Sequence, residues 1–147
     1  MSVQPTQKAL RKVSILAIER VFASTLLLAK DFFYMASLRD GKQKGLGLNP
    51  SFEINLVSPD GLPVSSFSNV ALPADKALDD ADLIILPAFS GDFDLLRARY
   101  PEILPWLRER HSAGSIICGE ANGAFWIAQA GLLDGKEATT YRRYFRE

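Results

Sequence analysis

The sequence predicts a single α/β domain, built as a doubly wound, mostly parallel sheet with helices on both faces. Short, continuously apolar runs recur at 13–18, 83–86 and 115–118, and such runs are typical of strands buried on both faces. Stretches in which apolar residues recur at helical spacing separate these runs, as a doubly wound fold requires. The 147 residues suffice for one domain with a sizeable core.

The first half of the chain supplies two strands and one long helix. Residues 1–12 are polar and without periodicity, so we expect a loose leader before a domain that spans 13–147. The run 13–18 predicts a strand, and 23–38 a helix for which Ser24 is a candidate N-cap. Glycines and lysines at 41–47 indicate a loop. The pattern further predicts a strand at 52–57, a turn at 58–61, extended chain at 62–73 and a short helix at 75–80.

The second half continues the alternation. The clearest strand pattern is 83–86, which Pro87 ends. A helical stretch begins at Asp92, is broken at Pro101 and resumes at 105–110, where Pro105 suits a first turn. A buried strand is predicted at 115–118, a helix at 122–130 closed by Gly131, and a short strand at 138–140.

Composition narrows the function classes. The 48% hydrophobic and 23% charged fractions are ordinary for a globular protein, and 17 basic residues balance 17 acidic ones. No basic stripe predicts DNA contact, since the basic residues near the two ends are explained as solvated (Lys8, Arg11, Lys12, Arg142, Arg143, Arg146). No apolar run is long enough for an export signal or a membrane span. One cysteine and one histidine exclude an internal disulfide and argue against a metal cluster. We expect a cytoplasmic protein that contacts no membrane and holds no metal or other cofactor.

Three separate segments are predicted to meet at one edge of the sheet. In open parallel sheets the functional site lies beyond the carboxyl ends of the strands. This rule places 19–20, 87–89 and 119–123 around one crevice. The candidate ligand-binding residues are those that face it: Glu19, Arg20, Ala88, Phe89, Glu120, Ala121 and Asn122.

The segment 116–124 has the spacing of a nucleophile elbow: strand, Gly119, three residues, Gly123, helix. In such an elbow the central residue lies on a strained turn, and the flanking glycines relieve crowding. That central residue is Ala121, which has no atom to attack with. The same spacing also fits an ordinary strand-to-helix turn that needs small residues.

The stretch from Gly119 to Thr140 resembles the class I glutamine amidotransferase-like, PfpI-type domain at the N-terminus of many AraC-type transcription regulators. Residues 80–87 look like that family's third-strand motif, and 13–33 resemble its opening strand, loop and helix more loosely. The resemblance covers nearly the whole chain and implies a flavodoxin-like sheet. It also implies a DNA-binding helix-turn-helix domain that this chain lacks, and a domain that stops here before its last elements.

The departures from the family pattern fall on its catalytic positions. The family's cysteine falls on Ala121, and the histidine after its paired threonines falls on Tyr141. The proline and glycine of its first loop fall on Glu19 and Arg20, and an aspartate of its first helix on Thr25. Its two glycines after the third strand become Ala88 and Phe89. Because a hydrolase needs a nucleophile with a base in reach, we expect no catalytic residues.

Two residues could be suggested as replacements for the missing catalytic groups. Cys118 precedes the elbow centre by three residues within an apolar strand, where a thiol is usually inert packing. His111 ends a predicted helix, where a cationic side chain is favourable for structural reasons. Both are interpreted as structural.

The remaining candidates concern ligand binding. Glu19 could pair with Arg20, meet a ligand amine or be solvated. Asn122 could present its amide, beside backbone N–H groups, to a small polar or anionic ligand. Phe89 is either lining or core, and Trp126 is better explained as core.

The leading hypothesis is a non-catalytic domain that senses an unknown small-molecule effector and forms a homodimer in an AraC-type regulator. DNA would be contacted only through the missing domain. An exposed sheet edge left by missing elements would favour pairing with a second chain. A rival is a small hydrolase or glyoxalase-like enzyme that uses Cys118 or Glu19. A third possibility is a degenerate domain that only dimerises.

Overall fold

The computed structural model describes residues 12–38 and 52–142, and the predicted parallel sheet lies within them. Five strands of the described part form one parallel sheet in the order β5-β2-β1-β6-β7, and two short strands form a separate antiparallel hairpin, β3-β4. The elements are β1 (Lys12–Leu16), α1 (Ala23–Leu38), β2 (Glu53–Ser58), β3 (Val64–Ser65), β4 (Ala71–Leu72), β5 (Lys76–Ala77), β6 (Leu83–Leu86), α2 (Phe93–Arg99), α3 (Ile103–Ser112), β7 (Ile116–Gly119), the 3-10 turn η1 (Ala121–Gly123) and α4 (Ala124–Gln129).

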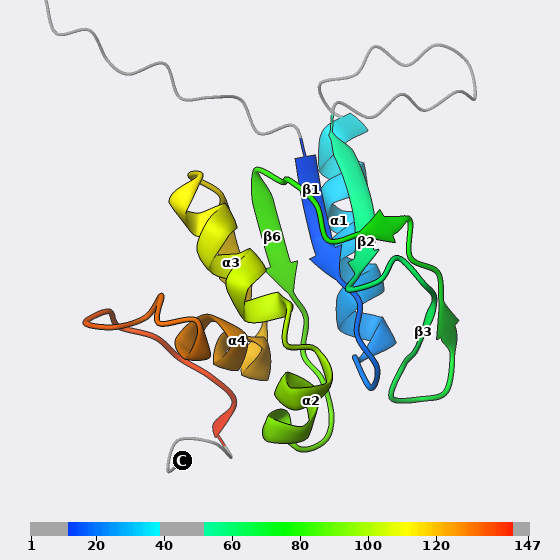
Figure 1. The fold of residues 1–147 in the computed structure, drawn as a ribbon. Helices are drawn as coiled ribbons and strands as arrows, with labels where there is room; N and C mark the ends of the chain where they lie inside the picture. The colour runs from blue at the N-terminus through cyan, green and yellow to red at the C-terminus, as the bar shows by residue number, and fades with distance from the viewer. Residues whose placement is uncertain (1–11, 39–51, 143–147) are drawn as a thin grey trace, which may run out of the picture.

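The strand order explains why helices cover both faces. The chain moves outward from β1 to β2 through α1, then returns to β6 on the other side of β1 and moves outward again to β7 through α3. Since parallel crossovers are right-handed, opposite directions of travel place α1 on one face and α3 with α4 on the other (Figure 1). The order reverses between β1 and β6, which is where such folds bind ligands.

The centre of the sheet is the core of the domain. Every residue of β6 is buried, and Val13, Ile15 and Leu16 of β1 are almost fully shielded from solvent. Apolar side chains of α1 and α3 close the two faces, among them Leu26, Ile103 and Leu107. The continuous apolar runs that predicted buried strands are therefore confirmed for β1 and β6.

Most predicted elements are confirmed with small shifts at their ends. The long helix spans Ala23–Leu38 as predicted, but Ser24 lies inside its first turn, so the N-cap prediction is wrong. Asp92 caps α2, accepting hydrogen bonds from the backbone N–H groups of Asp94 and Leu95, and Pro105 lies in the first turn of α3. Gly131 follows α4 with a φ of 76°, the left-handed conformation expected of a helix-ending glycine.

The predicted helix at 75–80 is wrong, because this segment pairs with the edge of the sheet. Asp75 holds both backbone groups of Leu56: its own N–H donates to the Leu56 carbonyl, and its carboxylate accepts from the Leu56 N–H at 2.7 Å. Lys76 and Ala77 then extend the sheet as β5. Local spacing suggested a helix, but the neighbouring strand offered hydrogen bonds that a helix at this position would forgo.

The strand predicted at 138–140 is also wrong, since these residues run as irregular chain beside the elbow. The strand at 115–118 is present as β7 but is not buried as predicted. Ile116 is 59% exposed and Cys118 is exposed as well, because within the described residues β7 is the outermost strand. The leader 1–11, the glycine-rich loop and the basic residues from Arg143 onward lie outside the described residues. Lys12, assigned to the leader, begins β1.

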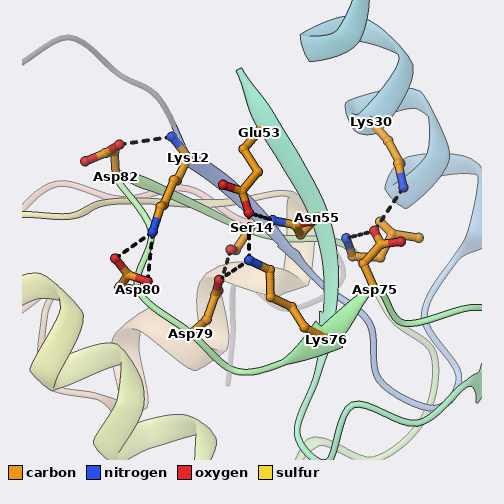
Figure 2. Close-up of polar contacts among 11 residues, drawn as sticks. Lys12, Ser14, Lys30, Glu53, Asn55, Asp75, Lys76, Asp79, Asp80 and Asp82 are labelled. Carbon is orange, nitrogen blue, oxygen red and sulfur yellow. Dashed lines mark hydrogen bonds and ion pairs between the residues drawn. The ribbon is translucent and has the colours of Figure 1, made fainter. Parts of the chain in front are cut away.

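An ion-pair network joins the segment before β6 to the starts of β1 and β2 (Figure 2). The Lys76 ammonium lies 2.8 Å from both the Glu53 and the Asp79 carboxylates, and Asp79 also accepts a hydrogen bond from the Ser14 hydroxyl. These partners raise the pKa of Lys76 and lower that of Glu53. These contacts attach the segment between β5 and β6 to the first residues of β1 and β2.

Candidate functional site

The residue at the centre of the elbow adopts the strained conformation that the sequence predicted. Ala121 has a φ of 48°, in the left-handed region that alanine disfavours by about 1–2 kcal/mol. One residue, Glu120, separates it from β7, and it begins the turn that leads into α4. A side chain at this position is held at the exposed end of the sheet, as a nucleophile would be.

The two flanking glycines are required by close backbone contacts. A Cβ on Gly119 would lie 2.7 Å from the Ala124 backbone nitrogen. A Cβ on Gly123 would lie 2.0 Å from the Leu86 carbonyl oxygen, at the end of β6. The elbow interpretation is thereby confirmed as geometry: the glycines let α4 approach β6 and β7, while Ala121 bears the strain.

The side chain of Asn122 connects the elbow to the loop after β6. Its Nδ2 donates to the Phe89 carbonyl at 2.8 Å, and its Oδ1 accepts from the Phe89 N–H at 3.1 Å. Asn122 is buried, and its amide is directed at the protein backbone. The group predicted to face a ligand therefore serves first to position Phe89.

The loop after β1 joins the same assembly through backbone contacts. Val21 pairs with Phe89 in an isolated β-bridge, and the Phe22 N–H donates to the Ala88 carbonyl. Arg20 has a φ of 65° and donates from Nε to the Ser90 carbonyl at 3.0 Å. All three predicted segments thus meet at the carboxyl ends of β1, β6 and β7, as the fold rule required.

The side chains of these segments are divided between two hollows. Glu19 faces a cavity of about 280 Å³ near the α2–α3 junction, where its carboxylate accepts from the Arg99 guanidinium at 3.2 Å and its N–H donates to the Tyr100 hydroxyl. Phe89 and Asn122 line a larger groove of about 620 Å³ between α2 and α4. Ala88 is buried and lines neither hollow. The candidate residues therefore do not share the single crevice that was predicted, since Glu19 lines one hollow, and Phe89 and Asn122 line another.

Several residues around these hollows had no signal in the sequence. Phe93 and Phe125 form the walls of the larger groove, with ring centroids 5.7 Å apart. Arg99 and Tyr100 became relevant only because α2 carries them to Glu19. Phe125 lies inside the family-like stretch 119–140, which is the one clue that could have found it.

Ala121 and the segment before Tyr141, on which the resemblance places a cysteine and a histidine, lie close together in the structure. The Thr140 hydroxyl donates to the Ala121 carbonyl at 3.0 Å, so the chain returns to the elbow just before Tyr141, where the family has histidine. Glu19 pairs with Arg99 rather than with the elbow. Cys118 is exposed on β7, and His111 lies in the last turn of α3 as predicted. Within the described residues, no group of three His, Cys, Asp or Glu side chains could hold a metal ion.

Glu120 is the one carboxylic acid of the elbow. Burial raises its pKa, and its Oε2 atom is buried without a hydrogen-bond partner among the described residues. A charged carboxylate in this position is disfavoured, because Oε2 is shielded from water and no ion pair to a described residue compensates for the loss of hydration.

Comparison with known proteins gives two curated relatives, although no family model matches the sequence. The HTH-type transcriptional regulator CdhR of Pseudomonas aeruginosa is 34% identical over 90 residues, which are 59% of this chain and 26% of the regulator. Isonitrile hydratase of Pseudomonas putida is 28% identical over 98 residues, 65% of this chain and 42% of the hydratase. The chain thus matches about a quarter of one relative and about two fifths of the other.

Solved structures are similar over nearly the whole chain. An AraC family transcriptional regulator from Pseudomonas putida superposes with a TM-score of 0.74 at 22% identity, covering 92% of this chain and 69% of that one. A two-domain protein from Anabaena variabilis with DJ-1/ThiJ/PfpI-like and ferritin-like domains gives 0.71 at 18%, covering 92% and 36%. The fold is that of the DJ-1/PfpI proteins.

The DJ-1/PfpI fold confirms the flavodoxin-like sheet predicted from the sequence, with β2-β1-β6-β7 as its central order. Both kinds of protein that the sequence resembles, PfpI-type proteins and AraC-family regulators, occur among the relatives and structural neighbours. No helix within residues 12–38 and 52–142 is long and apolar enough to cross a membrane.

Changing Ala121 to glycine is expected to stabilise the protein by about 0.5–1 kcal/mol. Glycine relieves the left-handed strain, and this gain exceeds its greater loss of backbone freedom on folding. Ala121→Val, whose branched side chain tolerates a positive φ least, is expected to destabilise. Urea denaturation of both variants measures the effect. Equal stabilities for valine and glycine would contradict the strained elbow.

Changing Glu120 to glutamine is expected to stabilise the protein at neutral pH and to have little effect in acid. In the folded state the pKa of Glu120 is raised, so its charged form lowers stability once the pH rises through that value. Below the ordinary value of 4.5 the carboxyl group is neutral folded and unfolded, and the difference disappears. Melting temperatures of both proteins across this pH range test the prediction; a gain that persists unchanged in acid would disprove its electrostatic origin.

Proposed function

We propose that this chain is a non-catalytic, ligand-sensing and dimerising domain that works with an AraC-type helix-turn-helix domain. The observation that supports this proposal most is the residue at the centre of the elbow. Ala121 has the strained backbone of a nucleophile elbow and is flanked by the two glycines that such a turn needs, yet its side chain is only a methyl group. The similarity to the transcriptional regulator CdhR supports this role. A domain without a reactive side chain at the elbow still has the cavities beside it. A ligand bound there can regulate the protein by shifting its conformational equilibrium, without being converted.

Catalysis by substitute residues is the rival, favoured by the similarity to isonitrile hydratase. It would need a nucleophile with a base in reach. Cys118 lies on the outer strand, and Glu19 is engaged by Arg99. We therefore expect the purified chain to show no turnover of amide, ester or isonitrile substrates. Turnover that is abolished by Cys118→Ser or Glu19→Gln would overturn the non-catalytic assignment.

Sensing is tested by stabilisation. A metabolite that binds the folded state raises the melting temperature by mass action. We expect a thermal-shift screen of small metabolites to find such a compound, and its effect to shrink when groove residues are changed. A purely dimerising domain would leave the melting temperature unaltered with every compound tested.

Regulation of transcription is tested at the gene. Reading the coding sequence downstream of codon 147 is expected to reveal two helix-turn-helix units. DNA binding by that protein should respond to the metabolite found in the screen, since an effector must bind two conformations unequally. DNA binding that the metabolite leaves unaltered would contradict the sensing role.

Homodimer formation is supported by two uncovered surfaces. On α1, Leu28, Phe32 and Met35 recur at helical spacing and are all exposed, Phe32 by 62%. Within the described residues β7 has one free edge, and such edges favour pairing with another chain. Sedimentation velocity is expected to give a dimer, whereas a well-folded monomer at all concentrations would exclude this part of the proposal.

A further inference from the structure

We propose that the groove between α2 and α4 is the effector site, and that its ligand is a small organic cation with an apolar body. This inference rests on the proposed sensing function and names the chemistry that the sensing site would accept. The groove holds about 620 Å³, within the range of pockets that take small molecules. It lies beside the elbow, between helices that are neighbours in Figure 1.

Aromatic rings form the apolar part of the groove and are already packed together. Phe89 and Phe93 are stacked with ring centroids 5.9 Å apart, and Phe93 meets Phe125 edge to face at 5.7 Å. Behind them Trp126 is buried with its ring centroid 4.9 Å from that of Phe93. Such rings bind apolar groups, and their faces attract cations.

The charged side chains that line the groove are both carboxylates. Asp92 and Asp94 line it together with the neutral Gln129, and within the described part of the chain no Lys, Arg or His does so. Arg97 pairs with Asp94 at 3.0 Å, which leaves Asp92 as the dominant charge. Asp92 uses its Oδ1 to cap α2, and a carboxylate has a second oxygen that can accept from a ligand.

These features select a ligand class. An anion would meet the negative charge of Asp92, which no Lys, Arg or His among the described lining residues balances, and is disfavoured. A neutral apolar molecule would pack against the aromatic rings but make no interaction with the Asp92 carboxylate. A protonated amine on a ring-sized apolar body uses both, because the rings take the body while Asp92 takes the N–H donors.

Three probes of matched size test this assignment by calorimetry on the whole chain. They are 2-phenylethylamine as the cation, 2-phenylethanol as the neutral molecule and 3-phenylpropanoate as the anion. We expect the cation to bind with a dissociation constant in the micromolar to millimolar range and tighter than either comparator. Equal or tighter binding of the neutral or anionic probe, or no binding of the cation in the millimolar range, overturns the proposal.

The variant Asp92→Asn removes the charge and keeps the helix cap, because asparagine caps helices as well as aspartate does. We expect it to weaken binding of the cation about tenfold and to leave the neutral probe unaffected. Phe125→Leu should weaken the cation about threefold or more. The control Glu137→Gln changes net charge equally at an exposed position outside the groove lining, and should have no effect. An unchanged affinity of Asp92→Asn for the cation excludes the site.

Failure of this inference is distinguishable from failure of the proposed function. If a metabolite stabilises the chain and the Asp92→Asn variant equally, sensing stands and the cation assignment is wrong. If the cation binds the groove but leaves DNA binding by the encoded regulator unchanged, the ligand class is right and the regulatory role of the groove is wrong.

Discussion

Replacing Gly123 with alanine is expected to cost at least about 3 kcal/mol of folding stability, the largest single-residue effect we foresee in the elbow. A Cβ at this position would lie 2.0 Å from the Leu86 carbonyl oxygen, 2.9 Å from the Leu86 carbonyl carbon and 3.1 Å from the Pro87 carbonyl oxygen. All three are backbone atoms at the end of the central strand β6, so none can move aside alone. Either α4 moves away from the sheet or the domain fails to fold.

The control for this change is Gly135→Ala. Gly135 has a positive φ of 70°, whereas Gly123 has an ordinary helical φ of −55°, and nothing lies within 4 Å of the position that a Cβ on Gly135 would take. Only backbone strain remains there, about 1–2 kcal/mol. Guanidinium denaturation of both variants separates strain from collision. Comparable losses for the two glycines would contradict the close approach of α4 to β6.

Replacing Asn122 with leucine is expected to cost about 2–5 kcal/mol. Leucine has a similar shape but cannot exchange hydrogen bonds with Phe89, whose N–H and carbonyl groups are then buried without partners. Each unsatisfied group costs about 1–3 kcal/mol. The measurement is the free energy of unfolding, with hydrogen exchange of the Phe89 amide as a local readout. Because Phe89 also pairs with Val21, we expect faster exchange in the loop after β1 as well.

Thr140→Val is the matched control for this clamp. It removes one hydrogen bond to the Ala121 carbonyl at an exposed site, where water replaces the lost hydroxyl, and should cost under about 1 kcal/mol. A loss for Asn122→Leu no larger than that of Thr140→Val would show that the Phe89 contact contributes little. Contacts other than the hydrogen bonds of Asn122 would then have to hold Phe89 in the wall of the groove.

The elbow of this protein has the backbone geometry of a nucleophile elbow but no nucleophilic side chain at its centre. Gly119, Gly123 and the left-handed Ala121 preserve the turn on which this type of fold presents a reactive group. Asn122, next to it, holds Phe89 and hence one wall of the groove between α2 and α4. The geometry of the elbow thus has a structural use even without a nucleophile at its centre, since it positions the surface proposed to bind the effector.

Within the candidate site, the sequence predicted the segments better than the side chains. That 19–20, 87–89 and 119–123 meet followed from strand order alone, because carboxyl ends of parallel strands share one edge. The direction of each side chain depends on its contacts with other parts of the folded domain, such as α2. Tyr100 and Arg99 draw Glu19 into a separate cavity, and Asn122 turns its amide to backbone.

The sequence by itself determined the alternation of strands and helices, the elbow and the absence of a nucleophile at Ala121. These depend on local periodicity, on glycine spacing and on residue identity, which neighbours in the chain express directly. Only the tertiary structure decided that 75–80 joins the sheet, that β7 is exposed and that the crevice is two hollows. Each of these depends on residues that are far apart in the sequence. Asp75 joins the sheet through its hydrogen bonds to Leu56, and Glu19 is held in the smaller hollow by Arg99. Cys118 is exposed because β7 is the outermost strand among the described residues. Such contacts carry no local pattern, because their energy arises only when the folded chain brings the groups together.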